Sequence, residues 1–253
     1  MRKLLTVIVA IIAMFVPAMC VAESGKDVGT VRGSQSVGLV LSGGGAKGIA
    51  HIGVIRALEN ADIPIDYVCG TSMGAIVGGL YSAGYTTDEM LDLILSKGFS
   101  YWSTGKIDPS LCYNFTMPEP TPALFSFNVG GKADSIQNAV PASLISPIPM
   151  NFAFMELFAG FTAQTGGDFD SLMEPFRCVA SDVAAHRKVV LGHGSLGDAI
   201  RSSMSFPAVF QPTKFDGMLL YDGGIYDNFP VDVMRSTFAP DVMIGVDVSS
   251  SDS

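Results

Sequence analysis

The chain has 253 residues, of which 48% are apolar and 15% are charged, and its formal net charge at pH 7 is -9. This length and apolar content predict one compact domain with a large core, and they exclude an intrinsically disordered chain. The acidic balance repels phosphate backbones, so we expect no nucleic-acid partner. Any membrane contact has to be apolar rather than basic.

The N-terminus has the pattern of a secretory signal peptide. A basic pair at 2–3 precedes an apolar run over 4–16, and the Cys-Val-Ala sequence at 20–22 offers a small-residue cleavage site. The run is shorter than the ~20 residues that span a bilayer, which disfavours a retained anchor. Lipidation at Cys20 is a second alternative, disfavoured by the bulky residue before it. We expect removal of residues 1–22, a flexible segment over 23–36, and an exported protein that is periplasmic, outer-membrane-associated or secreted.

Short apolar runs alternate with runs of helical period, which is typical of βα units and a mostly parallel sheet. In chain order, the pattern predicts strands at 37–41, 65–69, 176–183, 188–191, 218–221 and 242–248. It predicts helices from the glycine loop to position 60, at 75–83, from Thr86 to a stop at Gly98, at 150–163 and at 196–204. A capping-box pattern at Thr86 and Glu89 and a hairpin turn at Asp216-Gly217 support two of these boundaries. Between 99 and 149, many prolines and weak periodicity predict an insertion or cap.

The cysteines have no metal-ligand spacing. Cys69, Cys112 and Cys178 remain after removal of the signal segment, and this number is odd. Cys69 and Cys178 lie inside apolar strand-like runs, where we expect buried small hydrophobic side chains. We therefore predict neither a metal site nor a cofactor.

Gly70-Thr71-Ser72-Met73-Gly74 matches the G-x-S-x-G pattern and lies between a predicted strand and a predicted helix. A strand that turns directly into a helix holds the serine in a strained conformation, and flanking glycines avoid collisions with the neighbouring backbone. The turn exposes the Ser72 hydroxyl and aims the first helical N–H groups at it. We interpret Ser72 as a nucleophile; the alternative is an ordinary glycine-rich turn with a passive serine.

The glycine loop over 43–48 admits three interpretations. It is not a P-loop, because Ile49 follows where a lysine is required. A dinucleotide site needs an acidic residue at the end of the second strand, but Asp66 lies at its beginning. The third interpretation is an oxyanion hole, in which backbone N–H groups of Gly44, Gly45 and Ala46 face a developing negative oxygen. Glycines needed only for helix–sheet packing remain the structural alternative.

Asp222 follows a predicted strand and precedes Gly223 and Gly224. Alone, this pattern is an ordinary turn. Together with the serine turn, the pattern favours a functional role for Asp222, because the ends of parallel strands converge on one crevice where ligands bind. We interpret Asp222 as a candidate base.

The three histidines offer a weaker alternative. A triad of Ser72, Asp182 and either His186 or His193 has the chain order of known hydrolases. Both histidines, however, are flanked by residues typical of exposed turns, and His51 lies within the first predicted helix. The triad stays open as a second hypothesis.

Four segments resemble bacterial, secreted patatin-like phospholipases in order and spacing. They are residues 42–48, residues 70–74, the stretch from Ser203 through Pro207 with Phe210 and Pro212, and Asp222-Gly223-Gly224 with Asn228 and Pro230. The resemblance implies one domain over 37–248, with a three-layer α/β/α fold and a mostly parallel central sheet.

The resemblance also implies hydrolysis of phospholipid or other lipid esters by a Ser–Asp dyad without a catalytic histidine. It makes Ser72 the nucleophile and Asp222 the base. The oxyanion hole then comprises Gly43, Gly44, Gly45, Ala46 and Met73, and the other motif positions are Lys47, Gly48, Gly70, Gly74, Gly223 and Gly224. Lys47 stands where many relatives have arginine, and we expect little effect because the backbone does the binding.

Further expectations concern partners. The mostly apolar segment 150–161 predicts either a mouth for acyl chains that contacts a lipid surface transiently, or a buried core helix. Bacterial relatives with signal peptides often precede an outer-membrane β-barrel, so the polar tail at 249–253 is either an end or the start of a further domain. A dinucleotide-binding oxidoreductase and a catalytically silent lipid-recognition domain are the alternatives from other classes.

Overall fold

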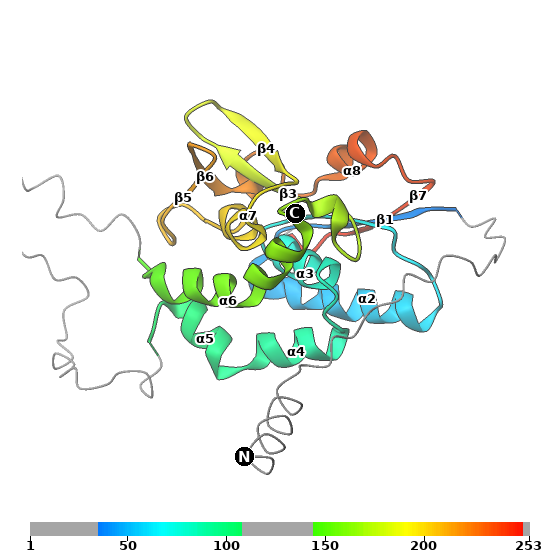
Figure 1. The fold of residues 1–253 in the computed structure, drawn as a ribbon, viewed down its shortest axis with the longest axis horizontal. Helices are drawn as coiled ribbons and strands as arrows, with labels where there is room; N and C mark the ends of the chain where they lie inside the picture. The colour runs from blue at the N-terminus through cyan, green and yellow to red at the C-terminus, as the bar shows by residue number, and fades with distance from the viewer. Residues whose placement is uncertain (1–34, 108–143, 250–253) are drawn as a thin grey trace, which may run out of the picture. The chain divides into compact units, whose positions relative to one another are not determined.

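The computed structural model describes residues 35–107 and 144–249, and within them seven strands form one sheet (Figure 1). The strands are β1 Val37–Leu41, β2 Tyr67–Thr71, β3 Phe176–Asp182, β4 Arg187–Leu191, β5 Thr213–Phe215, β6 Met218–Asp222 and β7 Val242–Val246. Four of them run parallel in the order β3-β2-β1-β7. β4 and β6 both pair antiparallel with β3, and β5 pairs antiparallel with β6. The predicted parallel sheet is confirmed in its centre, and it continues into an antiparallel region at β3.

β2 and β6 share one edge of β3, because β4 covers the other edge from Cys178 to Asp182. β2 pairs with the first part of β3 and ends with Thr71 opposite Val179. β6 pairs with the second part and ends with Asp222 opposite Ala180. The carboxyl ends of β2 and β6 therefore meet at adjacent residues of β3.

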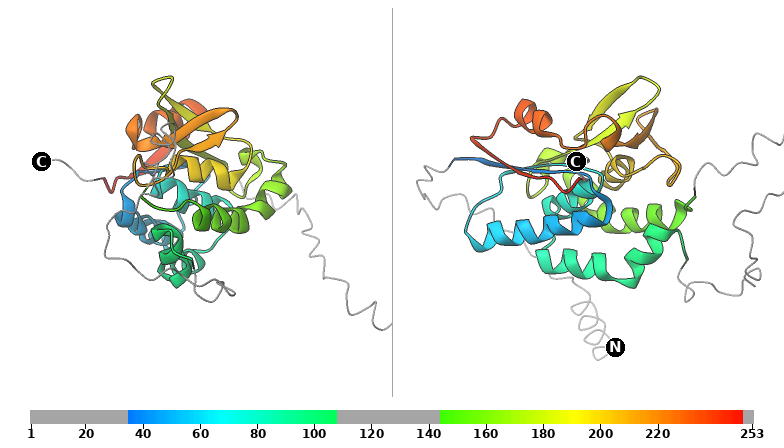
Figure 2. Two further views of the ribbon diagram at one scale, coloured as in Figure 1. Left: turned by 90° about the vertical axis from the view of Figure 1, so that its left-hand side faces the viewer. Right: turned by 180° about the vertical axis from the view of Figure 1, so that it is seen from behind.

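Helices cover both faces of the sheet. In chain order, the helical segments are η1 Gly45–Ile49, α2 Ala50–Asn60, α3 Met73–Ser82, α4 Thr87–Leu95, α5 Lys97–Thr104, α6 Ile148–Thr165, η4 Phe169–Ser171, α7 Leu196–Ser203, η5 Gly223–Ile225 and α8 Val231–Thr237. Figures 1 and 2 show α8 on one side of the sheet and α2 to α6 on the other. The predicted three-layer α/β/α arrangement is confirmed, with outer layers of unequal size.

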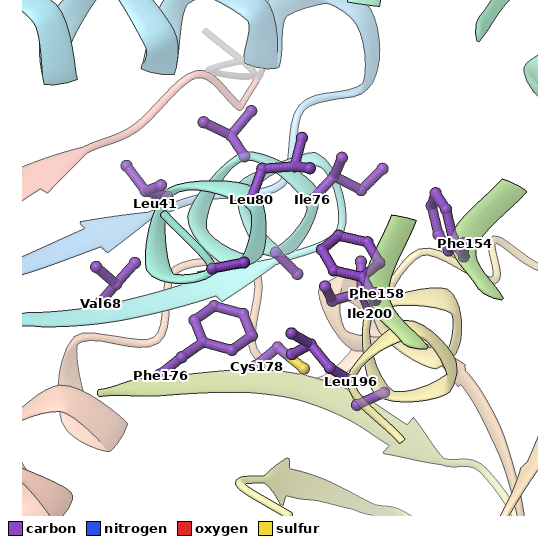
Figure 3. Close-up of a cluster of buried hydrophobic side chains, with 14 of the residues drawn as sticks. Leu41, Val68, Ile76, Leu80, Phe154, Phe158, Phe176, Cys178, Leu196 and Ile200 are labelled. Carbon is purple, nitrogen blue, oxygen red and sulfur yellow. The ribbon is translucent and has the colours of Figure 1, made fainter. Parts of the chain in front are cut away.

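The core follows the two-residue period of the strands. Leu39 and Leu41 of β1 point into the larger apolar cluster, whereas Val40 points into the smaller cluster that includes Val233 and Met234 of α8. Figure 3 shows the larger cluster between the sheet, α3, α6 and α7, with the β3 side chain of Phe176 packed beneath α3. This packing fixes the first helical turn of α3 over the carboxyl end of β2.

Several predicted boundaries shift. β2 begins and ends two residues later than predicted. Asp66 lies just before the strand, and its carboxylate accepts the N–H of Val37 at 2.7 Å. The predicted tight turn at 70–74 therefore contracts, and α3 already begins at Met73. The hairpin between β5 and β6 turns at Asp216 and Gly217 as predicted, both with positive φ.

The helix that was predicted to stop at Gly98 ends earlier. The capping box of Thr86 and Glu89 is present at the start of α4, as predicted. α4 ends at Leu95, however, because the Ser96 side chain accepts the N–H of Phe99 and thereby starts α5. The first part of the stretch predicted to be weakly periodic is thus helical.

Other predictions concern residues that the structure does not describe. The signal segment, residues 23–34, the stretch 108–143 with Cys112, and the tail from 250 lie outside the described residues. Cys69 and Cys178 are free and buried, as predicted. No helix within 35–107 and 144–249 has the length and apolar character that crossing a membrane requires.

Candidate active site

Ser72 occupies the sharp turn between β2 and α3. Its backbone has φ 54° and ψ -118°, a left-handed conformation that side-chain-bearing residues rarely adopt. The flanking glycines are sterically required, because a Cβ on Gly70 would collide with the Gly74 carbonyl and one on Gly74 with the Leu41 carbonyl. The strained turn predicted from the G-x-S-x-G pattern is therefore present.

The Ser72 hydroxyl donates a hydrogen bond of 2.7 Å to Oδ2 of Asp222. The other carboxylate oxygen, Oδ1, accepts the N–H of Gly224 at 2.7 Å. Asp222 is only 5% exposed, and this burial raises the pKa of its carboxyl group, although the bonds from Ser72 and Gly224 partly oppose the shift. The arrangement pairs a hydroxyl with a poorly solvated carboxylate.

The route by which Asp222 reaches Ser72 differs from the predicted one. The prediction relied on the carboxyl ends of parallel strands, but β6 runs antiparallel to β3. Asp222 nevertheless arrives beside Ser72, because β6 ends where β2 ends on the same edge of β3. The meeting depends on how far β6 extends along that edge, not on a shared strand direction.

The glycine loop lies directly against Ser72. A Cβ on Gly43 would lie 3.1 Å from Ser72 Cβ and would collide with the side chain of Asn228. The Gly43 N–H donates to the Asn228 carbonyl at 3.1 Å, and Asn228 Nδ2 donates to the Gly43 carbonyl at 3.2 Å. Gly43 thus anchors the loop, and its N–H is not free to bind an oxyanion, which corrects the predicted set of donors.

The other predicted donors keep their N–H groups free. Within the described part of the chain, the backbone N–H groups of Gly44, Gly45, Ala46 and Met73 have no acceptor. Gly45 has φ 55°, which suits a glycine at the start of η1. Free N–H groups at the starts of η1 and α3 form a region that attracts negative charge.

His51 contacts the backbone just before the glycine loop. Its Nε2 lies 2.9 Å from the Ser42 carbonyl oxygen, and its Nδ1 is buried without a partner among the described residues. Burial lowers the pKa of His51, so the ring is neutral at neutral pH and Nε2–H donates to Ser42. The role of His51 in this structure is to hold the backbone that leads into the loop.

The remaining histidines lie at the surface. His193 faces Asp216 at 3.2 Å, and the Tyr226 hydroxyl lies 3.4 Å from His186 Nδ1. The carboxylate of Asp182 accepts the N–H of Ala185. In the described residues the Ser72 side chain bonds to Asp222 and to no histidine, so the alternative triad is not assembled.

Ser72 and Asp222 open onto a cavity of about 820 Å³. The glycine loop and Lys47 form its polar side. Its apolar side includes Phe99, Trp102, Met150, Phe154, Phe206 and Phe210. Such a mostly apolar cavity with a few convergent polar groups is typical of a site for a small apolar ligand.

The sequence interpretation missed α5 as a wall of this cavity. Phe99 and Trp102 lie three residues apart on α5, and this helical spacing is the signal that was available. α6 is partly a core helix, because Phe158 is buried; Phe154 lines the cavity, and Phe152 and Met155 are 61% and 57% exposed. Among the described residues, no three potential metal ligands cluster together.

The model of the family described as patatin-like phospholipase matches residues 39–235. The chain belongs to this family. The patatin-like chain is 33% identical over 218 residues to Lysophospholipase nte1 of Neurospora crassa. The matched region covers 86% of this chain and 12% of that protein. It is 33% identical over 224 residues to an NTE family protein of Mycobacterium bovis, covering 88% of this chain and 52% of that protein. The chain thus spans about half or less of the length of these relatives.

Among solved structures, VipD from Legionella pneumophila is similar to the patatin-like chain with a TM-score of 0.47 and 19% identity. The similarity covers 78% of this chain and 47% of that one. Family membership and the position of the glycine loop against Ser72 both argue against the dinucleotide-binding alternative.

Proposed function

We propose that this chain hydrolyses lipid esters, with Ser72 as nucleophile and Asp222 as general base. The observation that carries the proposal is the 2.7 Å hydrogen bond from the Ser72 hydroxyl to the buried Asp222 carboxylate at the wall of an apolar cavity. Membership of the patatin-like phospholipase family and the lysophospholipases among its relatives support a phospholipid or lysophospholipid as the substrate class.

In the first step, Ser72 Oγ attacks the ester carbonyl carbon and its proton passes to Asp222 Oδ2. Oδ2 faces the hydroxyl because the Gly224 N–H holds Oδ1. Partial desolvation raises the pKa of the carboxyl group and makes it a better base than a solvated aspartate. Asp222 then returns the proton to the leaving alcohol, and an acyl-enzyme on Ser72 remains.

In the second step, Asp222 takes a proton from water as the water attacks the acyl-enzyme, and the fatty acid leaves as the proton returns to Ser72. The carbonyl oxygen becomes negative in both steps. The free N–H groups of Gly44, Gly45, Ala46 and Met73 are the proposed donors to it. One such donor is worth about 2.7–4 kcal/mol of barrier in acyl-transfer enzymes.

The acyl chain lies against the aromatic wall formed by α5 and α6, and the head group lies toward Lys47 and solvent. The exposed side chains of Phe152 and Met155 give α6 an outer apolar face, which supports transient contact with a lipid surface. The pattern at 1–22 supports export from a bacterial cell, which N-terminal mass spectrometry of the mature protein tests.

The decisive experiment is labelling with a fluorophosphonate, followed by mass spectrometry of the modified peptide. We expect the adduct on Ser72, and we expect Ser72→Ala to lose both labelling and hydrolysis of a lysophospholipid. The double variant His186→Gln, His193→Gln is the matched control and keeps its activity, because both rings lie at the surface. Hydrolysis that survives in Ser72→Ala contradicts the proposal.

A further inference from the structure

The end of α7 contacts the backbone of both residues of the Ser72–Asp222 pair. We call residues 203–205 the α7 turn. The hydroxyl of Ser203 accepts the backbone N–H of Ser72 at 3.0 Å. Two residues later, the carbonyl of Ser205 accepts the backbone N–H of Asp222 at 3.0 Å. The α7 turn therefore bonds to the backbone of both Ser72 and Asp222, which are 150 residues apart in the sequence.

The Ser72 N–H has a specific need for this partner. The pairing of β2 with β3 ends at Thr71 and Val179, and the positive φ of Ser72 turns the chain out of the ladder. Among the described residues, Ser203 Oγ is the acceptor that replaces the missing strand partner. The same hydroxyl donates to the Val179 carbonyl at 2.6 Å, so Ser203 joins the turn at Ser72 to β3.

The bond to Ser203 also keeps the Ser72 N–H from acting as an oxyanion donor. Because this N–H points at Ser203, it is not directed toward the oxyanion that forms at Ser72. The bond holds the peptide group before Ser72, from which the Ser72 Cα and side chain extend. Ser203 is fully buried, so water does not compete for either of its hydrogen bonds.

A buried arginine anchors the α7 turn. Arg201 is 2% exposed, and its Nη1 donates to Ser205 Oγ at 2.7 Å while its Nε donates to Asn151 on α6. Its guanidinium group lies over the Phe210 ring, 5.2 Å from the ring centre. Within the described residues, no carboxylate forms an ion pair with Arg201. Its charge is thus matched by neutral acceptors and an aromatic face, which ties the turn to α6 and to the cavity wall.

We propose that the α7 turn positions the nucleophile and the base relative to each other, with Ser203 as the residue that orients Ser72. This inference rests on the proposed function of Ser72 and Asp222. Ser203 does not line the cavity, and its hydroxyl bonds to backbone groups rather than to Ser72 Oγ, so it is a positioning residue. Its loss should slow the attack on the ester without weakening substrate binding in the cavity.

The test compares three variants of Ser203 with a matched control on the same helix. Ser203→Ala removes the hydroxyl, Ser203→Cys keeps the volume with a weak acceptor, and Ser203→Thr keeps a hydroxyl. Ser202→Ala is the control, because Ser202 is equally buried and its hydroxyl donates only to the Asp198 carbonyl within α7. For each variant, kcat, KM, the rate of fluorophosphonate labelling and the thermal midpoint are measured.

We expect kcat and the labelling rate to fall about tenfold to a hundredfold in Ser203→Ala and Ser203→Cys, with KM within about twofold, because an N–H without an acceptor lets Ser72 depart from its attacking geometry. Ser203→Thr recovers most of the rate. Ser202→Ala keeps wild-type kcat even where its thermal midpoint falls as far as that of Ser203→Ala, which separates positioning from general stability.

Wild-type kcat in a folded Ser203→Cys protein overturns the inference, and so does an equal loss of kcat in Ser202→Ala. These outcomes are distinct from failure of the proposed function. If Ser72→Ala remains active, the dyad itself is wrong. If Ser72→Ala is inactive and Ser203→Cys has wild-type kcat, the dyad stands and only the positioning role of Ser203 falls.

Discussion

Replacement of Asp222 by asparagine separates the chemistry of the carboxylate from its place in the fold. Asp222→Asn preserves size and shape, but only one of the two terminal atoms then accepts hydrogen bonds. The Gly224 N–H needs an acceptor at the position of Oδ1, so the amide oxygen stays there. The amide nitrogen must then occupy the place of Oδ2 and donate to Ser72 Oγ. The variant therefore keeps the contact and loses the base.

The expected magnitude follows from the proposed role of Asp222 as the proton acceptor. General-base catalysis contributes about 10²–10⁴ in rate, which corresponds to about 2.7–5.4 kcal/mol of barrier. Because burial raises the pKa of Asp222 on folding, the ionised carboxylate destabilises the folded state at neutral pH. This cost disappears as the pH falls through the raised pKa. The neutral amide removes it at all pH values, so Asp222→Asn should unfold at a higher temperature than the wild type.

The assay is kcat/KM for a soluble ester as a function of pH, together with the thermal midpoint at neutral pH. In the wild type, activity falls as the pH drops through the raised pKa of Asp222, and this acid limb is absent in Asp222→Asn. Asp216→Asn in the exposed β5–β6 hairpin is the matched control and should keep wild-type kinetics. A kcat within about threefold of wild type, or an unchanged acid limb in Asp222→Asn, refutes the assignment of the base.

The remaining predictions concern the backbone around Ser72. Gly74→Ala should abolish folding or fluorophosphonate labelling, because the added Cβ collides with the Leu41 carbonyl of β1. Gly160→Ala on α6 is the contrast, because a Cβ there meets open space. It should raise the free energy of unfolding by about 0.5–1 kcal/mol, measured by denaturant unfolding. Lys47→Met should change kcat by less than about threefold, because the proposed oxyanion donors are backbone N–H groups and not the Lys47 side chain. His51→Leu removes the donor to the Ser42 carbonyl and should slow labelling of Ser72 without abolishing it, in contrast to a catalytic histidine.

Local sterics made the turn at Ser72 predictable from the sequence. Gly70 and Gly74 are required by contacts with backbone a few residues or one strand away, and such contacts leave a recognisable glycine pattern. The glycine loop was recognisable as a pattern, but its contacts are long-range: a Cβ on Gly44 would collide with Val248, and Gly43 is held by Asn228. The Gly43 N–H is taken by Asn228, which lies 185 residues later, and no local pattern encodes that bond.

The long-range parts of the site could not be predicted in this way. An apolar run ending in Asp222 indicates a strand, but it does not indicate which edge of β3 the strand joins or in which direction. The cavity wall on α5 was missed because prolines and weak periodicity dominate the wider stretch around Trp102. Ser203 belonged to the resembling segments without a role, since only the folded chain brings its hydroxyl to Ser72.

In the described structure no histidine contacts the Ser72–Asp222 pair, so the orientation of the two side chains has to come from the groups that hold their backbone. The structure concentrates those groups around Val179 of β3. Ser203 donates to the Val179 carbonyl, and Gly223 packs so closely against it that a side chain there would collide. β2 ends opposite Val179, and β6 ends opposite the next residue. The Val179 peptide thus lies between the α7 turn, the residue after Asp222 and the ends of both strands, so a shift of this peptide should change the distance between the Ser72 hydroxyl and the Asp222 carboxylate.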